Sequence, residues 1–587
     1  MAPSPPPRLL ACYVRLWAAA TLLRILVATG RGDPLTPEIS LLVVAILMAT
    51  ICPSRPRIVA FALFLRIILF FRVGGPLSNS QNWAMHFDFS LLLAILGHLR
   101  GSRTLTAVEE AGIVATAGTA TRLQLVIFYL ASGAWKMNTS FADSEYSCAS
   151  VYIVSLVGHR LSDDARLLHA LARVAPVATI AGELLLPLLQ AAPRPGRWSR
   201  LGVAATLLFH FLIGITPPPH NIALYGVITT TRLYFWQPEA TARACAELAS
   251  SRWLAPTMVV FALVTMLYVR TAEGHGNPGL VGLAKLDLCL GYICGLCVLF
   301  GRALVIEAQR EQLPYSRAVW PDGGRSSGEA GRLVRPMAAL AIVYAFALPM
   351  LGLQERGGCL MFAQVRLHGG SNHVLLPTAL LQRWLAAADP RSALSGGVVR
   401  VEAFRTSGAT DWVGQGFAEQ LPPSTRRMLW EARVPSRYVP VPYYRAGTAG
   451  LPLVSAPPHF LPHTLSALGL RQMLARARAI GDAFSVRYVR LGAEGDEVWR
   501  QTAVGEGVVS LREEPWPGGR RSCRIRKRGG ATWWLPWRSW SRACDARERA
   551  LVEAPTRHTW LVTHWLMPMP NPLVEGAVRE MHCVSIS

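Results

Sequence analysis

Long apolar segments are the feature of this chain that most restricts its fold. They follow one another up to about Leu353, whereas the residues from there to Ser587 have the mixed composition of a globular domain. A helix needs about 20 mostly apolar residues to cross the roughly 30 Å hydrocarbon core of a bilayer. The sequence therefore predicts an all-α polytopic membrane bundle of about nine to eleven spans over 1–353, then a soluble domain over 354–587. The candidate spans are Leu10–Thr29, Ile39–Cys52, Ile58–Val73, Phe87–Leu99, Gly112–Trp135, Val174–Leu189, Leu201–Ile215, Ile222–Trp236, Pro256–Val269, Leu280–Leu304 and Pro336–Leu353.

The composition agrees with this division and excludes several classes of protein. Hydrophobic residues make up 51% of the chain and charged residues only 16%, which argues against a disordered, collagen-like or small disulfide-stabilised protein. The net charge of +23 is spread evenly, with 29 basic and 18 acidic residues up to Leu353 and 30 and 18 after it. Because neither half has a dense basic patch, the expected partner is the lipid bilayer and not nucleic acid.

Arginine-rich loops predict how the chain is oriented in the membrane. The loop Ala192–Arg200 has three arginines and no acid, and the loop from Ala303 to Arg335 is also rich in arginine. Four candidate spans separate these loops, so both lie on the same side, which the positive-inside rule makes cytosolic. One further span would place the tail 354–587 on the opposite, luminal or extracellular side.

The tail contains both helical and strand-like patterns, so we expect a mixed α/β domain. Val399–Phe404 has the β-branched content of a strand, and Leu470–Ala483 has helical apolar spacing. The tail has enough residues for an independent domain, so it could be the functional unit, with the bundle as its anchor. Disulfide pairing cannot be derived from the sequence. The tail cysteines are Cys359, Cys523, Cys544 and Cys583.

Lys136 is the first candidate for a functional residue in the membrane. The chain has 59 basic residues, but only Lys136, Lys285 and Lys527 are lysines. Arginine remains charged under almost all conditions, whereas a desolvated lysine can lose its proton and act as a base. Lys136 ends a long apolar segment, where an anchor at the membrane surface is the simpler interpretation.

Other polar groups occur on neighbouring apolar segments. Asn82 and His86 begin one segment, Glu183 is an isolated acid in another, and His210 lies inside a third, which Asn221 follows. Each group alone could be structural. Ionisable groups within spans are costly, so several of them on successive helices are expected to face one site inside the bundle.

These residues occur in an order that resembles a known family. The shared features along the chain are Asn82-x-x-x-His86, Tyr129-x-x-x-Gly133-x-x-Lys136, the acid Glu183, and Phe209-His210 followed by Asn221. They are similar to the vitamin K-dependent gamma-carboxylase family and, more broadly, to the horizontally transferred transmembrane domain that microbial proteins share with it. The segment Cys359–His373 also resembles the region after the last span in microbial members. The resemblance covers roughly residues 10–375 by architecture.

The resemblance implies a specific chemistry. Lys136 would be the base that deprotonates a vitamin K hydroquinone or a similar prenylated quinol, and His86 would stabilise the oxyanion. The remaining cofactor-binding positions would be Asn82, Glu183, His210 and Asn221. Oxygen and CO2 would be co-substrates, and the quinol would become an epoxide as a glutamate is carboxylated. A base must be neutral, and a pocket without water favours a neutral amine.

The sequence also departs from the family. Met137-Asn138-Thr139-Ser140-Phe141 follows Lys136, where the animal enzyme has an acid and a tryptophan. The tail shows no match to the animal enzyme's substrate-binding region, so binding of a protein or peptide substrate there is a separate expectation. The resemblance implies a location in the endoplasmic reticulum or another endomembrane. The alternative is a non-catalytic transporter or scaffold, in which the same polar groups form a structural network.

Overall fold

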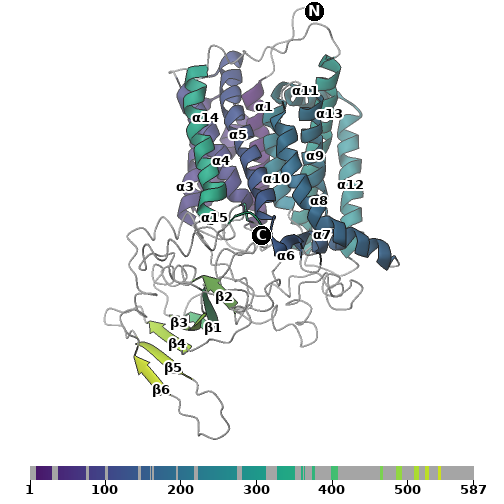
Figure 1. The fold of residues 1–587 in the computed structure, drawn as a ribbon. Coiled ribbons are helices and arrows are strands. Elements are labelled where there is room, and N and C mark those ends of the chain that lie inside the picture. The colour runs from purple at the N-terminus through teal and green to yellow at the C-terminus, as the bar shows by residue number, and fades with distance from the viewer. Residues whose placement is uncertain are drawn as a thin grey trace, which may run out of the picture.

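The fold is described from a computed structural model of residues 1–587. The residues it describes are 8–28, 37–73, 79–99, 104–142, 144, 147–158, 160–161, 164–192, 196–216, 223–273, 280–311, 327–350, 359–360, 363, 373–376, 398–406, 463–466, 484–491, 508–513, 522–527 and 540–543. The helices form a bundle, and the strands lie beyond one end of it (Figure 1).

The helical elements account for most of the described chain. They are α1 (Leu9–Ala28), α2 (Pro37–Ile51), α3 (Pro56–Val73), α4 (Asn79–His98), α5 (Ala107–Trp135), α6 (Thr139–Ala142), α7 (Cys148–Val157), α8 (Ala165–Ala191), α9 (Arg197–Gly214), α10 (Ala223–Arg232), the 3-10 helix η1 (Leu233–Trp236), α11 (Pro238–Ser250), α12 (Leu254–Glu273), α13 (Leu280–Glu311), α14 (Ser327–Ile342), the π-helix η2 (Val343–Ala347) and α15 (Leu348–Met350).

Five described helical segments are long and apolar enough to cross a membrane, as a multi-pass membrane protein requires. This count is lower than the predicted nine to eleven. The other helices are shorter or more polar: α2 has 15 residues, and α3 has three arginines within 18 residues. The five segments are Leu9–Leu26, Ala107–Trp135, Arg166–Ala191, Asp287–Arg310 and Leu333–Met350.

Helix α5 is central to the bundle and packs against α4, α8 and α14. It begins at a capping box, in which Thr106 and Glu109 satisfy each other's backbone N–H groups. Small residues on α5 allow its neighbours to approach closely, and a Cβ atom added to Gly133 would lie 3.0 Å from Leu184 on α8. The 29 residues of α5 end at Trp135, so Lys136 lies at one end of the bundle.

The predicted span Ile222–Trp236 is divided into two elements. Helix α10 ends at Arg232, and η1 continues to Trp236. Thr229, Thr230 and Thr231 each donate a hydrogen bond to the carbonyl four residues earlier, an arrangement that weakens or bends a helix. A run of three threonines therefore explains why this helix is shorter than its apolar pattern predicts.

The prediction of a mixed α/β tail is wrong for the part of the tail that the structure describes. Its regular elements there are all strands, which form one antiparallel sheet in the order β2-β1-β3-β4-β5-β6. A bulge at Val401/Ala403 interrupts the pairing of β1 with β3. The predicted helix at Leu470–Ala483 lies outside the described residues. The strands are β1 (Val398–Thr406), β2 (His463–Ser466), β3 (Phe484–Leu491), β4 (Val508–Glu513), β5 (Ser522–Lys527) and β6 (Trp540–Ala543).

The two ends of the bundle differ in their cysteines. Helices α6, α7 and α15 lie at the end nearer the sheet, and α11 lies at the opposite end (Figure 1). Cys148 on α7 is disulfide-bonded, whereas Cys245 on α11 is a free thiol. Cys359 in the tail is a buried free thiol.

Candidate active site

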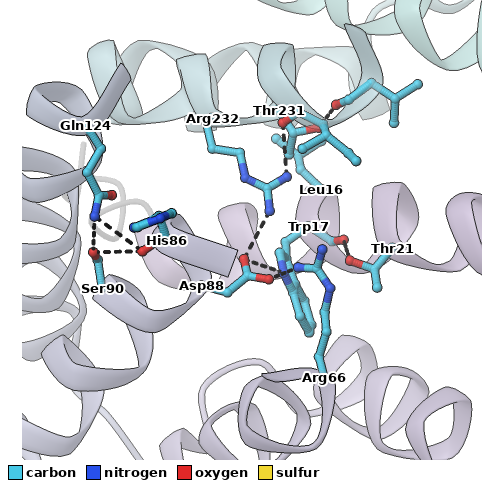
Figure 2. A network of polar contacts seen from close by, with 12 residues as sticks. Leu16, Trp17, Thr21, Arg66, His86, Asp88, Ser90, Gln124, Thr231 and Arg232 are labelled. Atoms are coloured by element: carbon cyan, nitrogen blue, oxygen red, sulfur yellow. Dashed lines mark hydrogen bonds and ion pairs between the residues drawn. The ribbon is translucent and has the colours of Figure 1, made fainter. Parts of the chain in front are cut away.

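A buried ionic network fixes α4 within the bundle. Asp88 lies between the guanidinium groups of Arg66 and Arg232, and the indole of Trp17 donates a hydrogen bond to it (Figure 2). All four side chains are buried, and they come from α1, α3, α4 and α10. Because a lone carboxylate inside a membrane is costly, this pairing is what allows Asp88 to lie there.

A second group of hydrogen bonds holds the backbone around His86. Ser90 donates to the His86 carbonyl at 2.9 Å, and Gln124 on α5 donates to Ser90 at 3.0 Å (Figure 2). His86 is therefore on a helical turn that is fixed from α5 by Gln124 and from the other side by the Asp88 network. The sequence drew attention to His86 but not to Gln124, Arg66 or Arg232.

Lys136 forms an ion pair with Glu183 inside the protein. The Lys136 Nζ atom lies 2.7 Å from Glu183 Oε2 and 3.5 Å from the carbonyl of Ser132. Lys136 is 6% exposed and Glu183 is 7% exposed, so the lysine does not extend to the surface as an anchor would. The amine also lies over the ring of Phe141, 5.8 Å from its centroid. The structure thus joins two predicted site residues that are 47 positions apart.

His210 joins the same region through Tyr129. Its Nε2 atom makes a short hydrogen bond with the Tyr129 hydroxyl, and Tyr129 interacts electrostatically with Glu183. The rings of Trp83 and Tyr225 lie 5.3 Å apart between centroids, and the His210 ring lies 5.3 Å from Tyr225. Tyr129 on α5 and Tyr225 on α10 therefore contact the imidazole, and Trp83 on α4 packs against both of these tyrosines.

His86 lies on a neighbouring part of the same aromatic cluster. Its ring is 5.3 Å from Phe128 and 4.7 Å from Tyr344, measured between centroids. Phe128 in turn stacks on Trp83 at 4.9 Å, and Asn82, which precedes Trp83, is buried. Asn221 lies outside the described residues. Apart from Tyr129, which belonged to the recognised pattern, the sequence did not identify these aromatic residues as part of the site.

The chain that follows the last membrane helix covers the Lys136 end of α5. Asn138 donates hydrogen bonds to the carbonyls of Trp135 and Ala363, and Val374 donates to the carbonyl of Met137. The buried Cys359 thiol interacts with Trp83 and with the charges of Lys136 and Glu183. The bonds of Asn138 to Ala363 and of Val374 to Met137 join positions more than 200 residues apart.

His373 connects this segment to α5 in a defined protonation state. Its Nε2 lies 2.8 Å from the Ala134 carbonyl, while its Nδ1 accepts hydrogen bonds from the backbone N–H groups of Leu375 and Leu376. The ring is therefore neutral, with its proton on Nε2. Burial lowers the pKa of His373 below its usual value of 6.5.

Acid should loosen this connection. A histidine with a lowered pKa contributes stability that is present above its unfolded pKa and is lost as the pH falls. We expect the melting temperature to decrease between about pH 7.5 and pH 5.5, and we expect a weaker decrease in His373→Gln. Thermal unfolding in detergent across this range measures both. An unchanged slope in His373→Gln would contradict this assignment.

Gly133 allows α5 and α8 to meet where Lys136 pairs with Glu183. A Cβ atom there would lie 3.0 Å from Leu184 and 3.2 Å from the backbone carbon of Glu183, whereas one at Gly182 would meet nothing within 4 Å. Gly133→Ala should therefore lower stability by about 1–3 kcal/mol through overpacking. Gly182→Ala should be neutral or raise stability by up to about 1 kcal/mol through helix propensity. Thermal melting of both variants tests this, and equal shifts would refute the close packing.

Comparisons with known proteins inform only the tail. A family described as "Domain of unknown function (DUF8388)" matches residues 371–563, which lie wholly within the tail and cover less than half of the chain. No curated protein and no solved structure matches the chain. Among the residues that the structure describes, no group of three or more His, Cys, Asp or Glu side chains could hold a metal ion.

Proposed function

We propose that the chain is a membrane-embedded enzyme of the gamma-carboxylase type, in which Lys136 acts as a base on a lipid quinol. The observation that carries this proposal is a buried amine–carboxylate pair next to an aromatic cluster that contains two imidazoles. A dry site of this kind suits an apolar ring with polar oxygens, which is the chemical class of a prenylated hydroquinone.

The histidines support a ligand of this class. The Nδ1 atoms of His86 and His210 are buried and have no hydrogen-bond partner among the described residues. A buried polar atom without a partner costs about 1–3 kcal/mol. A hydroquinone has hydroxyl groups at opposite ends of its ring, and these groups could pair with such nitrogens, while Trp83, Phe128 and Tyr225 would contact its faces.

The ion pair supports the assignment of the base. An amine can accept a proton only when it is neutral, and Glu183 Oε2 lies 2.7 Å from Lys136 Nζ. The ammonium proton can therefore pass to the Glu183 carboxylate, which leaves the Lys136 amine free to take a proton from a bound hydroxyl group. Both side chains are buried, which limits their contact with water during this transfer. A bound hydroquinone would supply the electrons for reaction with O2.

We also propose the endoplasmic reticulum or another endomembrane as the location. The disulfide at Cys148 and the arginine-rich loops both support a tail on the luminal side. A tail on this side could present a protein or peptide substrate, with CO2 as the second co-substrate that the resemblance implies.

Mass spectrometry of lipids that co-purify with the protein in mild detergent tests the ligand. We expect a prenylquinone in the wild type and at least a tenfold loss of it in Trp83→Leu, since anchoring residues of this type contribute roughly 2 kcal/mol or more. The matched control is Trp198→Leu, because Trp198 lies on the bundle surface, 52% exposed. Retention of equal quinone in both variants would contradict the proposed site. The absence of any quinone in the wild type would favour the non-catalytic transporter or scaffold.

A further inference from the structure

Two cysteines from distant parts of the chain meet at the end of the bundle opposite the tail. Cys12 on α1 and Cys245 on α11 are 233 positions apart, yet their sulfur atoms lie 3.3 Å from each other. Both are free thiols. A disulfide bond is about 2.05 Å long, so a small movement of the two side chains would bring the sulfurs to bonding distance.

The surroundings of the pair favour a reactive thiolate. The Cys12 thiol donates a hydrogen bond to the sulfur of Cys245, and this bond lowers the pKa of Cys245. Arg15, which is exposed one turn after Cys12, adds a positive charge that acts in the same direction. Both cysteines are partly exposed. The thiolate is the nucleophile in thiol–disulfide exchange.

The position of α11 gives such a bond a structural effect. Glu239 and Glu247 on α11 form ion pairs with Arg310 and Arg302 on α13. Helix α11 is therefore already attached to α13. A disulfide bond between Cys245 and Cys12 would also attach α11 to α1, the helix that carries Trp17 of the Asp88 network.

We propose that Cys12 and Cys245 are a reversible redox pair that forms an intramolecular disulfide between α1 and α11. The oxidant is a small disulfide such as oxidised glutathione. The Cys245 thiolate attacks one of its sulfurs and releases one glutathione thiolate, which takes up a proton. Cys12 then loses its proton and attacks the mixed disulfide at the Cys245 sulfur, releasing the second glutathione. The two cysteines are oxidised by two electrons in total, and the glutathione disulfide is reduced to two thiols.

The free thiols of Cys12 and Cys245 fit the orientation that the arginine-rich loops predict for the bundle. The pair lies at the end of the bundle that the arginine-rich loops assign to the cytosol, where thiols are normally kept reduced. Cys148, at the other end, is already in a disulfide. The Cys12–Cys245 pair would therefore respond to a change in the cytosolic thiol balance, which would leave the disulfide at Cys148 unaffected.

Peptide mapping of the full chain in detergent tests the proposal. After oxidised glutathione treatment and trypsin digestion without reductant, we expect the peptide Leu9–Arg15 to be linked to Ala244–Arg252. Each peptide contains one cysteine, so the link identifies the pair. Dithiothreitol should remove it, and Cys12→Ser should prevent it. The Cys294 and Cys297 thiols, which both lie on α13, are the internal control. Neither should become linked to the Cys12 or Cys245 peptide.

Thermal melting provides a second measurement. The disulfide closes a long loop and should raise the melting temperature by roughly 3 °C or more in the wild type, with no rise in Cys12→Ser or Cys245→Ser. Maleimide labelling of both thiols without any linked peptide after oxidation would overturn the proposal. A linked peptide that forms only in denatured protein would also overturn it.

Discussion

Asp88→Asn should prevent most of the protein from reaching a stable folded state. The Asp88 carboxylate forms ion pairs with both Arg66 and Arg232 and also accepts a hydrogen bond from Trp17. The substitution removes the negative charge and leaves two guanidinium groups inside the bundle. Breaking a buried ion pair in this way costs about 3–5 kcal/mol, which is a large fraction of the stability of a typical domain. The yield of monodisperse protein after size-exclusion chromatography and its melting temperature measure the effect.

Comparing Asp88→Asn with Glu239→Gln separates the effect of burial from the effect of losing an ion pair. Glu239→Gln also removes a carboxylate from an arginine, but Glu239 and Arg310 are partly exposed, with side chains 38% and 25% accessible. That change should cost at most about 1 kcal/mol. The double variant Asp88→Asn/Arg66→Met should recover part of the loss, because it removes one of the uncompensated charges. Equal melting temperatures for Asp88→Asn and Glu239→Gln would show that the network does not stabilise the fold.

The sequence predicted the helical bundle because the apolar residues of a membrane-spanning helix follow one another in the chain. Each span must be apolar over its own length, so Gly112–Trp135 could be recognised without knowledge of its neighbours. The helix boundaries were less predictable. Phe87–Leu99 was expected as a span, but α4 begins at Asn79, and Asn82 in its first turns is polar and yet buried. The partners of Asp88 come from other helices, so a local pattern cannot indicate them.

The candidate site was predictable to a similar extent. The cost of ionisable groups in a membrane singled out Lys136, Glu183 and His210, and the same rule applied to Arg66 and Arg232 would have indicated the Asp88 network. The covering segment could not be predicted. Its contact between Asn138 and Ala363 joins positions 225 residues apart, and no periodicity in either region signals it. In the tail, the strand predicted at Val399–Phe404 lies within β1, but the order of the strands in the sheet could not be predicted because it depends on partners far along the chain.

The alternative interpretation of Lys136 is that its ion pair with Glu183 is only structural. The distance of 2.7 Å between amine and carboxylate is compatible with both interpretations. A substitution that keeps the charge but removes the ability to act as a base separates them. Arginine remains charged, since its pKa exceeds about 12, and it can still pair with a carboxylate.

Lys136→Arg should therefore abolish quinol-dependent oxygen consumption while the protein remains folded and inserted in the membrane. Loss of a general base typically lowers the rate by a factor of about 10²–10⁴. Oxygen-electrode measurements with a reduced prenylquinone report activity, and thermal melting of the same samples reports folding.

Lys285→Arg is the control and should keep wild-type activity. The neutral pair Lys136→Met/Glu183→Gln should fold better than Lys136→Met alone, because it leaves no buried charge without a partner, yet it should be inactive. Full activity in folded Lys136→Arg would assign the lysine to structure alone.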